Sequence, residues 1–191
     1  MDDADVIGHS FPSPVLKRFQ MDATNECTKR DHEMLAGLQS VGFSLDSGPD
    51  GAGLWTKYLS RGGGYYIDTG CSALLASGAI KLKATSITRI NAHSIALADG
   101  DEIPADEIIF ATGYGNMQET AGEIFGEEVA KEAGEVWGFD AEGETRGVWR
   151  RSGKEGFWYM GGNLALCRFY SRALALQIKG MEEKLLTWGD P

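Results

Sequence analysis

Apolar side chains recur every three or four residues near both ends of the chain, which is the spacing of an amphipathic helix. The first such stretch, residues 13–41, opens with Ser13 as an N-cap and Pro14 in the first turn, and Gly42 marks its expected stop. An interruption of this stretch is expected near residues 22–24. The second stretch, residues 170–186, places its apolar side chains on one stripe. The pattern therefore predicts N-terminal helices and one amphipathic C-terminal helix.

The middle of the chain alternates apolar and polar side chains, which is the period of a half-buried strand. Residues 79–84, 86–90 and 93–98 follow this pattern and predict a three-stranded β-meander. Residues 107–111, EIIFA, are almost wholly apolar, so we expect them to form a strand inside a sheet.

The segment after residue 116 is expected to begin with an acidic helix over residues 117–135. Two more strands are expected at 147–151, GVWRR, and 156–162, GFWYMGG, and parallel pairing between EIIFA and GFWYM is open. The expected fold class is α+β, with a small, mostly antiparallel sheet, N-terminal helices and a C-terminal helix.

The length of 191 residues is that of about one domain. Within a single domain over residues 1–191 we expect three successive segments. These are a helical segment and loop over 1–60, a β-rich segment over 61–116, and the acidic helix, strands and C-terminal helix over 117–191.

The charge and cysteine content narrow the class of protein. A net charge of −10 argues against nucleic acid or an anionic membrane surface as a partner. No apolar run approaches the roughly 18 residues of a membrane helix, and the N-terminus lacks the pattern of a signal peptide. Cys27, Cys71 and Cys167 are too scattered for a disulfide framework or a zinc site. A cytoplasmic domain is expected.

Several motifs occur in an order that points to one family. The stretch ADEIIFATGYGN at 105–116 is preceded by GGGYYIDTGCSALLASGAIKLK at 62–83 and the meander. It is followed by GFWYMGGN at 156–163 and RFYSRALALQIKGME at 168–182. Together these segments closely resemble the C-terminal part of flavin-containing monooxygenase-like proteins, most of all the fungal and bacterial flavoproteins of the CzcO type.

The resemblance implies FAD- and NADPH-dependent oxygenation in the parent family and a remnant of a fold with two dinucleotide-binding domains. It implies that the ATGY turn returns the chain to the FAD domain and that the GGN segment lies near the flavin. The residues that carry these cofactor-binding roles by resemblance are Thr112, Gly113, Tyr114, Gly161, Gly162 and Asn163. A helix N-terminus expected near residues 168–171, which include Arg168, would favour a bound anion.

The glycine loops that hold FAD and NADP in such proteins are missing from this sequence. Neither GPDGAGLW nor RGGGYYID has the GxGxxG pattern between a strand and a helix. No cofactor is therefore expected for the isolated chain. Three hypotheses stay open: a stand-alone descendant that binds or rearranges a hydrophobic small molecule in secondary metabolism, a monooxygenase fragment that needs a partner chain, and a non-catalytic remnant.

Acid–base chemistry has a candidate pair beside the glycines of GGGYYIDTG. Tyr66 and Asp68 would share one face of an extended segment, with Tyr65 on the other. In an apolar pocket, burial would raise the pKa of the carboxyl and let the pair act as acid and orienting base. The alternative is that the tyrosines pack and Asp68 caps a turn.

The histidines offer a further candidate. His32 lies between two acidic residues on a predicted exposed helix face, and it is kept as a candidate catalyst although a surface role fits it, His9 and His93 alike.

The tryptophans have two possible roles. Five occur in 191 residues, and Trp55 and Trp158, with Arg168, are the expected substrate-binding side chains. Alternatively, most of them fill the core or cover surface that the missing domains would bury. Because such a surface is commonly covered by self-association, we expect a homodimer, or a partner chain that supplies the dinucleotide-binding domains.

Overall fold

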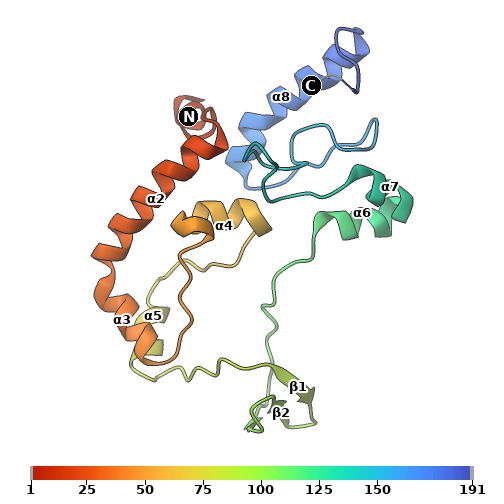
Figure 1. Ribbon diagram of the computed structural model, residues 1–191. Coiled ribbons are helices and arrows are strands. Elements are labelled where there is room, and N and C mark those ends of the chain that lie inside the picture. Colours follow the sequence, from red (N-terminus) through yellow and green to blue (C-terminus); the bar gives the residue numbers. More distant parts are fainter. Residues whose placement is uncertain (1, 190–191) are drawn as a thin grey trace. The chain divides into compact units, whose positions relative to one another are not determined.

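A computed structural model of the protein describes residues 2–189 (Figure 1). Its helices are α1 (Asp2–His9), α2 (Ser13–Arg30), α3 (His32–Ser40), the 3₁₀ turn η1 (Pro49–Gly51), α4 (Gly53–Arg61), α5 (Cys71–Ala76), α6 (Met117–Phe125), α7 (Glu127–Ala133) and α8 (Leu164–Glu182). Its strands are β1 (Ile87–Ile90), β2 (Ser94–Leu97) and β3 (Glu102–Pro104). The fold class is α+β, as predicted from the sequence.

Contacts between residues divide the described chain into two compact units. Unit 1 comprises residues 2–23, 48–65 and 114–189, and unit 2 comprises residues 24–47 and 66–113. The single domain expected from the length of the chain stays a prediction.

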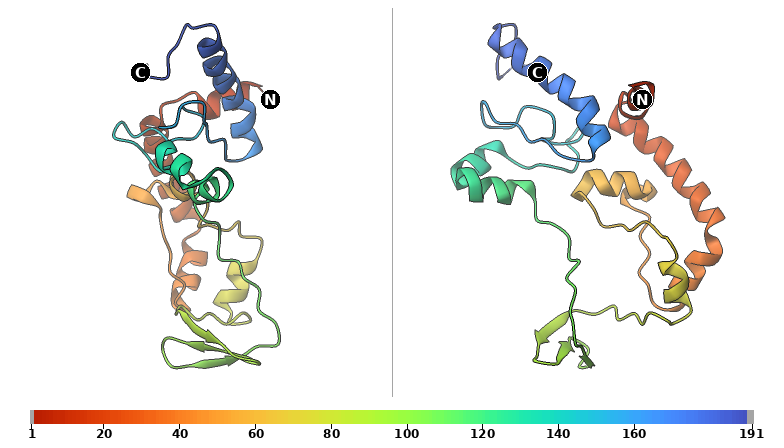
Figure 2. Two further views of the ribbon diagram at one scale, coloured as in Figure 1. Left: turned by 90° about the vertical axis from the view of Figure 1, so that its right-hand side faces the viewer. Right: turned by 180° about the vertical axis from the view of Figure 1, so that it is seen from behind.

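Unit 1 builds its core around an irregular segment, residues 135–162, rather than around a sheet. Helices α6 and α7 pack together beside this segment, and α1 contacts α8 (Figure 2). The buried core cluster consists of Ala121, Ala130, Ala133, Val136, Val148, Trp149, Tyr159 and Leu174.

A capping side chain and a glycine set helix boundaries in unit 1. Asn163 caps α8, because its side-chain oxygen accepts the backbone N–H groups of Ala165 and Leu166 at 3.0 Å. The predicted amphipathic C-terminal helix is confirmed, although it starts six residues earlier than expected. The predicted acidic helix is interrupted at Gly126, whose φ of 96° disfavours any residue with a side chain.

Unit 2 contains a three-stranded antiparallel meander, β1–β2–β3. Ile90 pairs with Ile95, and Ile95 pairs in turn with Ile103. Helices α3 and α5 pack so closely at Gly37 that a Cβ added there would lie only 3.1 Å from the Cβ of Ala76. The helical stretch of 13–41 is confirmed, with a stop just before Gly42, but its break lies at Asp31 and not near residues 22–24, which are within α2.

Four predicted strands are wrong, and for one reason. A strand is stable only when a neighbouring backbone satisfies its N–H and C=O groups. Residues 79–84 and 107–111 have no strand partner in the described part of the chain. Residues 147–151 and 156–162 meet only in an isolated parallel bridge between Val148 and Tyr159, so the proposed EIIFA–GFWYM pairing is also not formed.

The pattern also missed three helices. Helix α1 lies before the predicted helical stretch, α4 follows a loop that ends in glycine, and α5 is too short for a helical period to emerge. Within residues 2–189 no helix combines the length and apolar character needed to cross a lipid bilayer.

Candidate functional site

A cavity of about 100 Å³ with aromatic walls lies within unit 1. We call it the tryptophan cavity, because three of the five tryptophans line it. Its aromatic walls come from α1, α4, α8 and the irregular segment, and they are His9, Trp55, Trp137, Trp149 and Tyr170. Its polar wall consists of Ser13, Glu144, Thr145 and Arg150.

Two of these tryptophans adopt an unusual backbone conformation. Trp137 has φ of 70° and Trp149 has φ of 62°, in the left-handed region that bulky residues rarely enter. Such a conformation costs on the order of 1–3 kcal/mol per residue and persists only where the surroundings fix it. Both strained residues face one cavity, which makes the cavity the first candidate for a functional site.

Hydrogen bonds fix the two strained residues. The backbone N–H of Trp137 donates to the carbonyl of Arg146 at 3.1 Å. Trp149 donates from its backbone to Tyr159 at 2.9 Å and from its indole Nε1 to the carbonyl of Gly161 at 3.0 Å. The walls of the cavity are therefore held in place before any ligand arrives.

His9 provides the one imidazole of the cavity wall. Its ring stacks on Phe169 with centroids 5.5 Å apart and meets Trp55 edge-on at 6.2 Å. Its Nδ1 lies 2.9 Å from the carbonyl oxygen of Asp5, to which it must donate. In the neutral imidazole this contact leaves the lone pair on Nε2, so His9 can accept a proton there.

Arg168 stabilises the helix that carries His9. Its guanidinium donates two hydrogen bonds, of 2.9 and 2.8 Å, to the buried carboxylate of Asp5. These bonds hold the pKa of Asp5 below its ordinary value. Arg168 lies in the second turn of α8, so the predicted helix N-terminus at 168–171 is wrong, because the helix starts at Leu164.

Tyr170 supplies a protonated hydroxyl next to His9. Burial raises the pKa of this phenol above its ordinary value, and the negative charge of Glu144 raises it further. The hydroxyl donates to the carbonyl of His9 at 3.2 Å. Tyr170 therefore remains neutral at physiological pH.

Glu144 and Ser13 form the polar corner of the cavity. The carboxylate of Glu144 accepts the backbone N–H of Ser13 at 2.9 Å and its hydroxyl at 2.8 Å. The hydroxyl of Ser13 therefore bonds to a residue far along the chain, although the sequence predicts that it caps its own helix.

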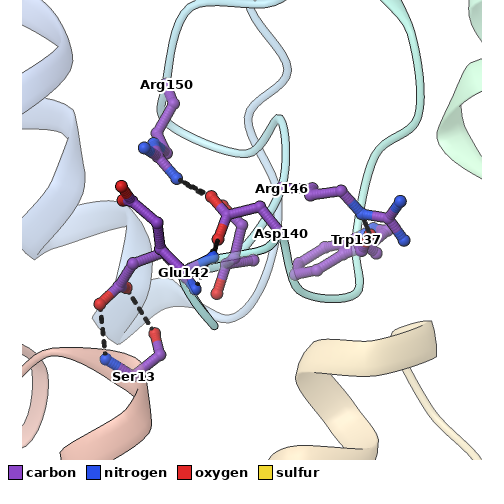
Figure 3. A network of polar contacts seen from close by, with 8 residues as sticks. Ser13, Trp137, Asp140, Glu142, Arg146 and Arg150 are labelled. Carbon is purple, nitrogen blue, oxygen red and sulfur yellow. Dashed lines mark hydrogen bonds and ion pairs between the residues drawn. The ribbon is translucent and has the colours of Figure 1, made fainter. Parts of the chain in front are cut away.

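A tight hairpin holds this corner, and Asp140 organises it (Figure 3). One oxygen of Asp140 accepts the backbone N–H groups of Glu142 at 3.0 Å and Glu144 at 2.9 Å, and the other accepts a guanidinium N–H of Arg150 at 2.8 Å. The bond from Glu144 is the main reason that the pKa of Asp140 lies below its ordinary value, and Arg150 adds to the effect. Asp140 is therefore ionised at neutral pH and fixes Arg150 at the cavity wall.

The predicted Tyr66–Asp68 pair lies in unit 2, in a different setting from the one expected. Both side chains form hydrogen bonds with Ser72. The Tyr66 hydroxyl lies 2.8 Å from the Ser72 Oγ, and the Asp68 carboxylate accepts the backbone N–H of Ser72 at 2.9 Å. Asp68 is exposed, and the backbone N–H of Ser72 lowers its pKa, whereas the hypothesis needed burial to raise it. The geometry matches the alternative, in which Asp68 caps a turn.

The other predicted catalytic residues do not share a site. His32 is exposed, with Nδ1 3.1 Å from the carbonyl of Lys29. Tyr65 belongs to unit 1 and contacts Tyr58 edge-on at 6.5 Å.

Of the predicted substrate-binding side chains, Trp55 lines the tryptophan cavity. Trp158 instead packs edge-on against Trp188 at 4.9 Å, and Arg168 is engaged by Asp5.

The residues assigned to FAD by resemblance are divided between the units: Thr112 and Gly113 belong to unit 2, and Tyr114, Gly161, Gly162 and Asn163 belong to unit 1. Thr112, Gly113 and Tyr114 are exposed and belong to an extended stretch without secondary structure. Asn163 already occupies the N–H groups of Ala165 and Leu166 that a pyrophosphate would need.

Gly161 and Gly162 have structural roles beside the tryptophan cavity. The carbonyl oxygen of Gly161 accepts the hydrogen bond from the indole Nε1–H of Trp149. Gly162 has φ of 103°, and a Cβ there would lie 2.4 Å from a methyl carbon of Leu166. Both glycines are therefore engaged in contacts within unit 1. Among residues 2–189 no group of three or more His, Cys, Asp or Glu side chains is placed to hold a metal ion.

Sequence reasoning missed most of the cavity. His9 was assigned to the surface, Tyr170 and Glu144 were not considered, and Trp137 and Trp149 were considered only as members of the set of five tryptophans. The only sequence signal was the abundance of tryptophan, because left-handed conformations at Trp137 and Trp149 depend on contacts distant in sequence.

The sequence matches no protein-family model, and it matches no curated protein. The resemblance to flavin-containing monooxygenase-like proteins therefore stays a prediction from the order of the motifs.

Proposed function

We propose that unit 1 binds a small, largely apolar molecule that places one ring in the tryptophan cavity. The observation that carries this proposal is the pair of strained residues, Trp137 and Trp149, which face the same cavity. Backbone strain concentrates at functional sites, and apolar walls with a few fixed polar groups are typical of ligand pockets.

The volume of the cavity limits the size of the group it accepts. A dry cavity of roughly 150 Å³ accommodates benzene, and pockets for drug-sized ligands measure roughly 300–1,000 Å³. The volume of about 100 Å³ suits a single ring or a short branched chain, with the rest of the ligand outside.

The binding proposal is tested by titrating benzamide into the protein and following tryptophan fluorescence. We expect a saturable change in the wild type that weakens about fivefold in Trp55→Leu, since one aromatic wall is lost. Trp188→Leu is the matched control, because Trp188 lies outside the cavity lining, and it should bind like the wild type. Equal weakening in both variants, or no saturation in the wild type, would contradict the proposal.

A second candidate function is proton transfer within the bound molecule. His9 favours it, because its Nδ1 contact leaves Nε2 free to take a proton from the ligand and return it to a neighbouring atom. Such a step is an isomerisation and needs neither oxidant nor reductant. The test is deuterium exchange at the methyl group of acetophenone in D₂O, measured by NMR. We expect wild-type protein to accelerate the exchange and His9→Gln to abolish the acceleration; equal rates would rule out this role.

We further propose that the chain descends from the back portion of a flavin-containing monooxygenase-like protein and works without FAD and NADP. Absorbance at 350–500 nm during titration with FAD tests this proposal. A protein that stays colourless agrees with it, and bound flavin would contradict it.

A homodimer is the proposed assembly. Its support is the EIIFA segment, which has the composition of a buried strand although Ile109 is 89% exposed. Size-exclusion chromatography with light scattering should give twice the chain mass of 20.7 kDa. A monomer that binds a separate dinucleotide-binding chain would instead favour the monooxygenase-fragment hypothesis.

A further inference from the structure

We propose that the ligand of the tryptophan cavity carries an anionic group, and that Arg150, with Arg146 and Arg151, receives it. This inference rests on the proposed binding function and adds the charge of the ligand to it.

A second cavity of unit 1 is rich in arginine. Its volume is about 570 Å³, and Arg146, Arg150, Arg151 and the amide of Gln177 contribute to its walls. Asp140 is the one carboxylate among its lining residues. Three guanidinium groups therefore gather at one place in a chain whose net charge is −10. We call this the arginine cavity.

Arg150 connects the two cavities, because it lines both of them. Thr145 and Arg146, which are neighbours along the chain, likewise line the tryptophan cavity and the arginine cavity respectively. A molecule with its ring against the tryptophans can therefore extend a substituent past Arg150 into the arginine cavity.

The guanidinium of Arg150 keeps donors for a ligand. Its Nη1 donates to Asp140 at 2.8 Å and reaches the carbonyl of Thr145 at 3.5 Å. Its Nε and Nη2 make no hydrogen bond among the described residues, so one edge of the fork remains for the two oxygens of an oxyanion. Asp140 fixes the group without occupying that edge (Figure 3).

The other charged groups around the two cavities determine how an anionic ligand is oriented. Arg146 is paired with Glu135, and Arg151 donates to the carbonyls of Thr187 and Trp188. Glu144 lies in the Ser13 corner of the tryptophan cavity, where its charge repels an anion. An anionic substituent is therefore favoured on the Arg150 side and disfavoured on the Glu144 side.

The experiment compares three probes that share one ring and differ in charge: benzoate, benzamide and benzylamine. Binding is measured by calorimetry at low salt to wild type, Arg150→Gln, Arg150→Lys and Arg30→Gln. Arg30 is the matched control, because it is an exposed arginine on α2.

We expect wild type and Arg30→Gln to bind benzoate at least about tenfold more tightly than benzamide, which is the size of a charge-assisted contact. Arg150→Gln should bind the two probes equally. Arg150→Lys should keep part of the preference for benzoate over benzamide, since lysine retains the positive charge but lacks the paired donors of the guanidinium. Phenyl phosphate in place of benzoate then distinguishes a phosphate ligand from a carboxylate.

Each other result overturns the inference. Equal binding of benzoate and benzamide by the wild type would refute it and leave the cavity proposal standing. Tightest binding of benzylamine would show that Glu144 and the aromatic walls select a cation instead. If no probe binds, the cavity proposal fails together with this inference.

Discussion

The two units differ in the relation between regular secondary structure and burial. In unit 1, the irregular segment 135–162 supplies buried core residues such as Val148, Trp149 and Tyr159. In unit 2, all four residues of the regular strand β1 are exposed, including Ile87 and Ile90. Hydrogen-bonded regularity and core formation are therefore separate properties here, and the candidate site lies where an irregular segment is buried.

The largest expected difference in the free energy of unfolding is between two alanine substitutions of apolar side chains, one in each unit. Trp149→Ala should lower the free energy of unfolding by about 3–5 kcal/mol, because it opens a void in the core and removes the indole bond to Gly161. Ile87→Ala should change it by less than about 0.5 kcal/mol, since this side chain is exposed. Urea unfolding followed by circular dichroism measures both; equal losses would refute the difference between the units.

A smaller effect is expected at the helix cap of unit 1. Asn163→Ala should cost about 1 kcal/mol, because two backbone N–H groups at the start of α8 lose their acceptor. Asn163→Ser keeps an acceptor and should retain most of the stability. If both variants unfold at the same urea concentration as the wild type, the cap does not stabilise α8.

The smallest effects concern pH, and both units should show them. The pKa values of Asp140 in unit 1 and Asp68 in unit 2 lie below the ordinary value of 3.8, in each case mainly through backbone N–H donors. A carboxyl group whose pKa is lower in the folded state than in the unfolded state stabilises the fold at pH values above its unfolded-state pKa. This contribution is lost as the pH falls through the folded-state pKa.

Unfolding curves between pH 6 and pH 2.5 test this linkage. Asp140→Asn and Asp68→Asn should each be less stable than wild type at pH 6 and should lose less stability on acidification. Curves parallel to that of the wild type would show that the carboxylate in question is not linked to folding.

The sequence predicted the regular parts of the fold better than the site. The helices of 13–41 and 170–186 and the strands at 86–90 and 93–98 have periods that depend on neighbouring residues, and they form close to the expected places. The EIIFA segment has the composition of a buried strand, but composition does not provide a pairing partner.

The site was harder to predict because its geometry depends on contacts distant in sequence. Glu144 meets Ser13 across 131 positions, and Arg168 meets Asp5 across 163. No local pattern indicates either contact. Trp55 was predicted to bind substrate and does line the cavity, whereas the Tyr66–Asp68 pair was chosen for its flexible glycines, and these accompany a capped turn.

The central claim, that three tryptophans enclose a binding cavity, is tested most directly by fluorine NMR. Protein labelled with 5-fluorotryptophan should give five resonances, which single Trp→Phe variants assign. On titration with benzoate, we predict that the signals of Trp55, Trp137 and Trp149 move and that those of Trp158 and Trp188 stay in place. Movement confined to Trp158 and Trp188, uniform movement of all five, or no movement would contradict the account.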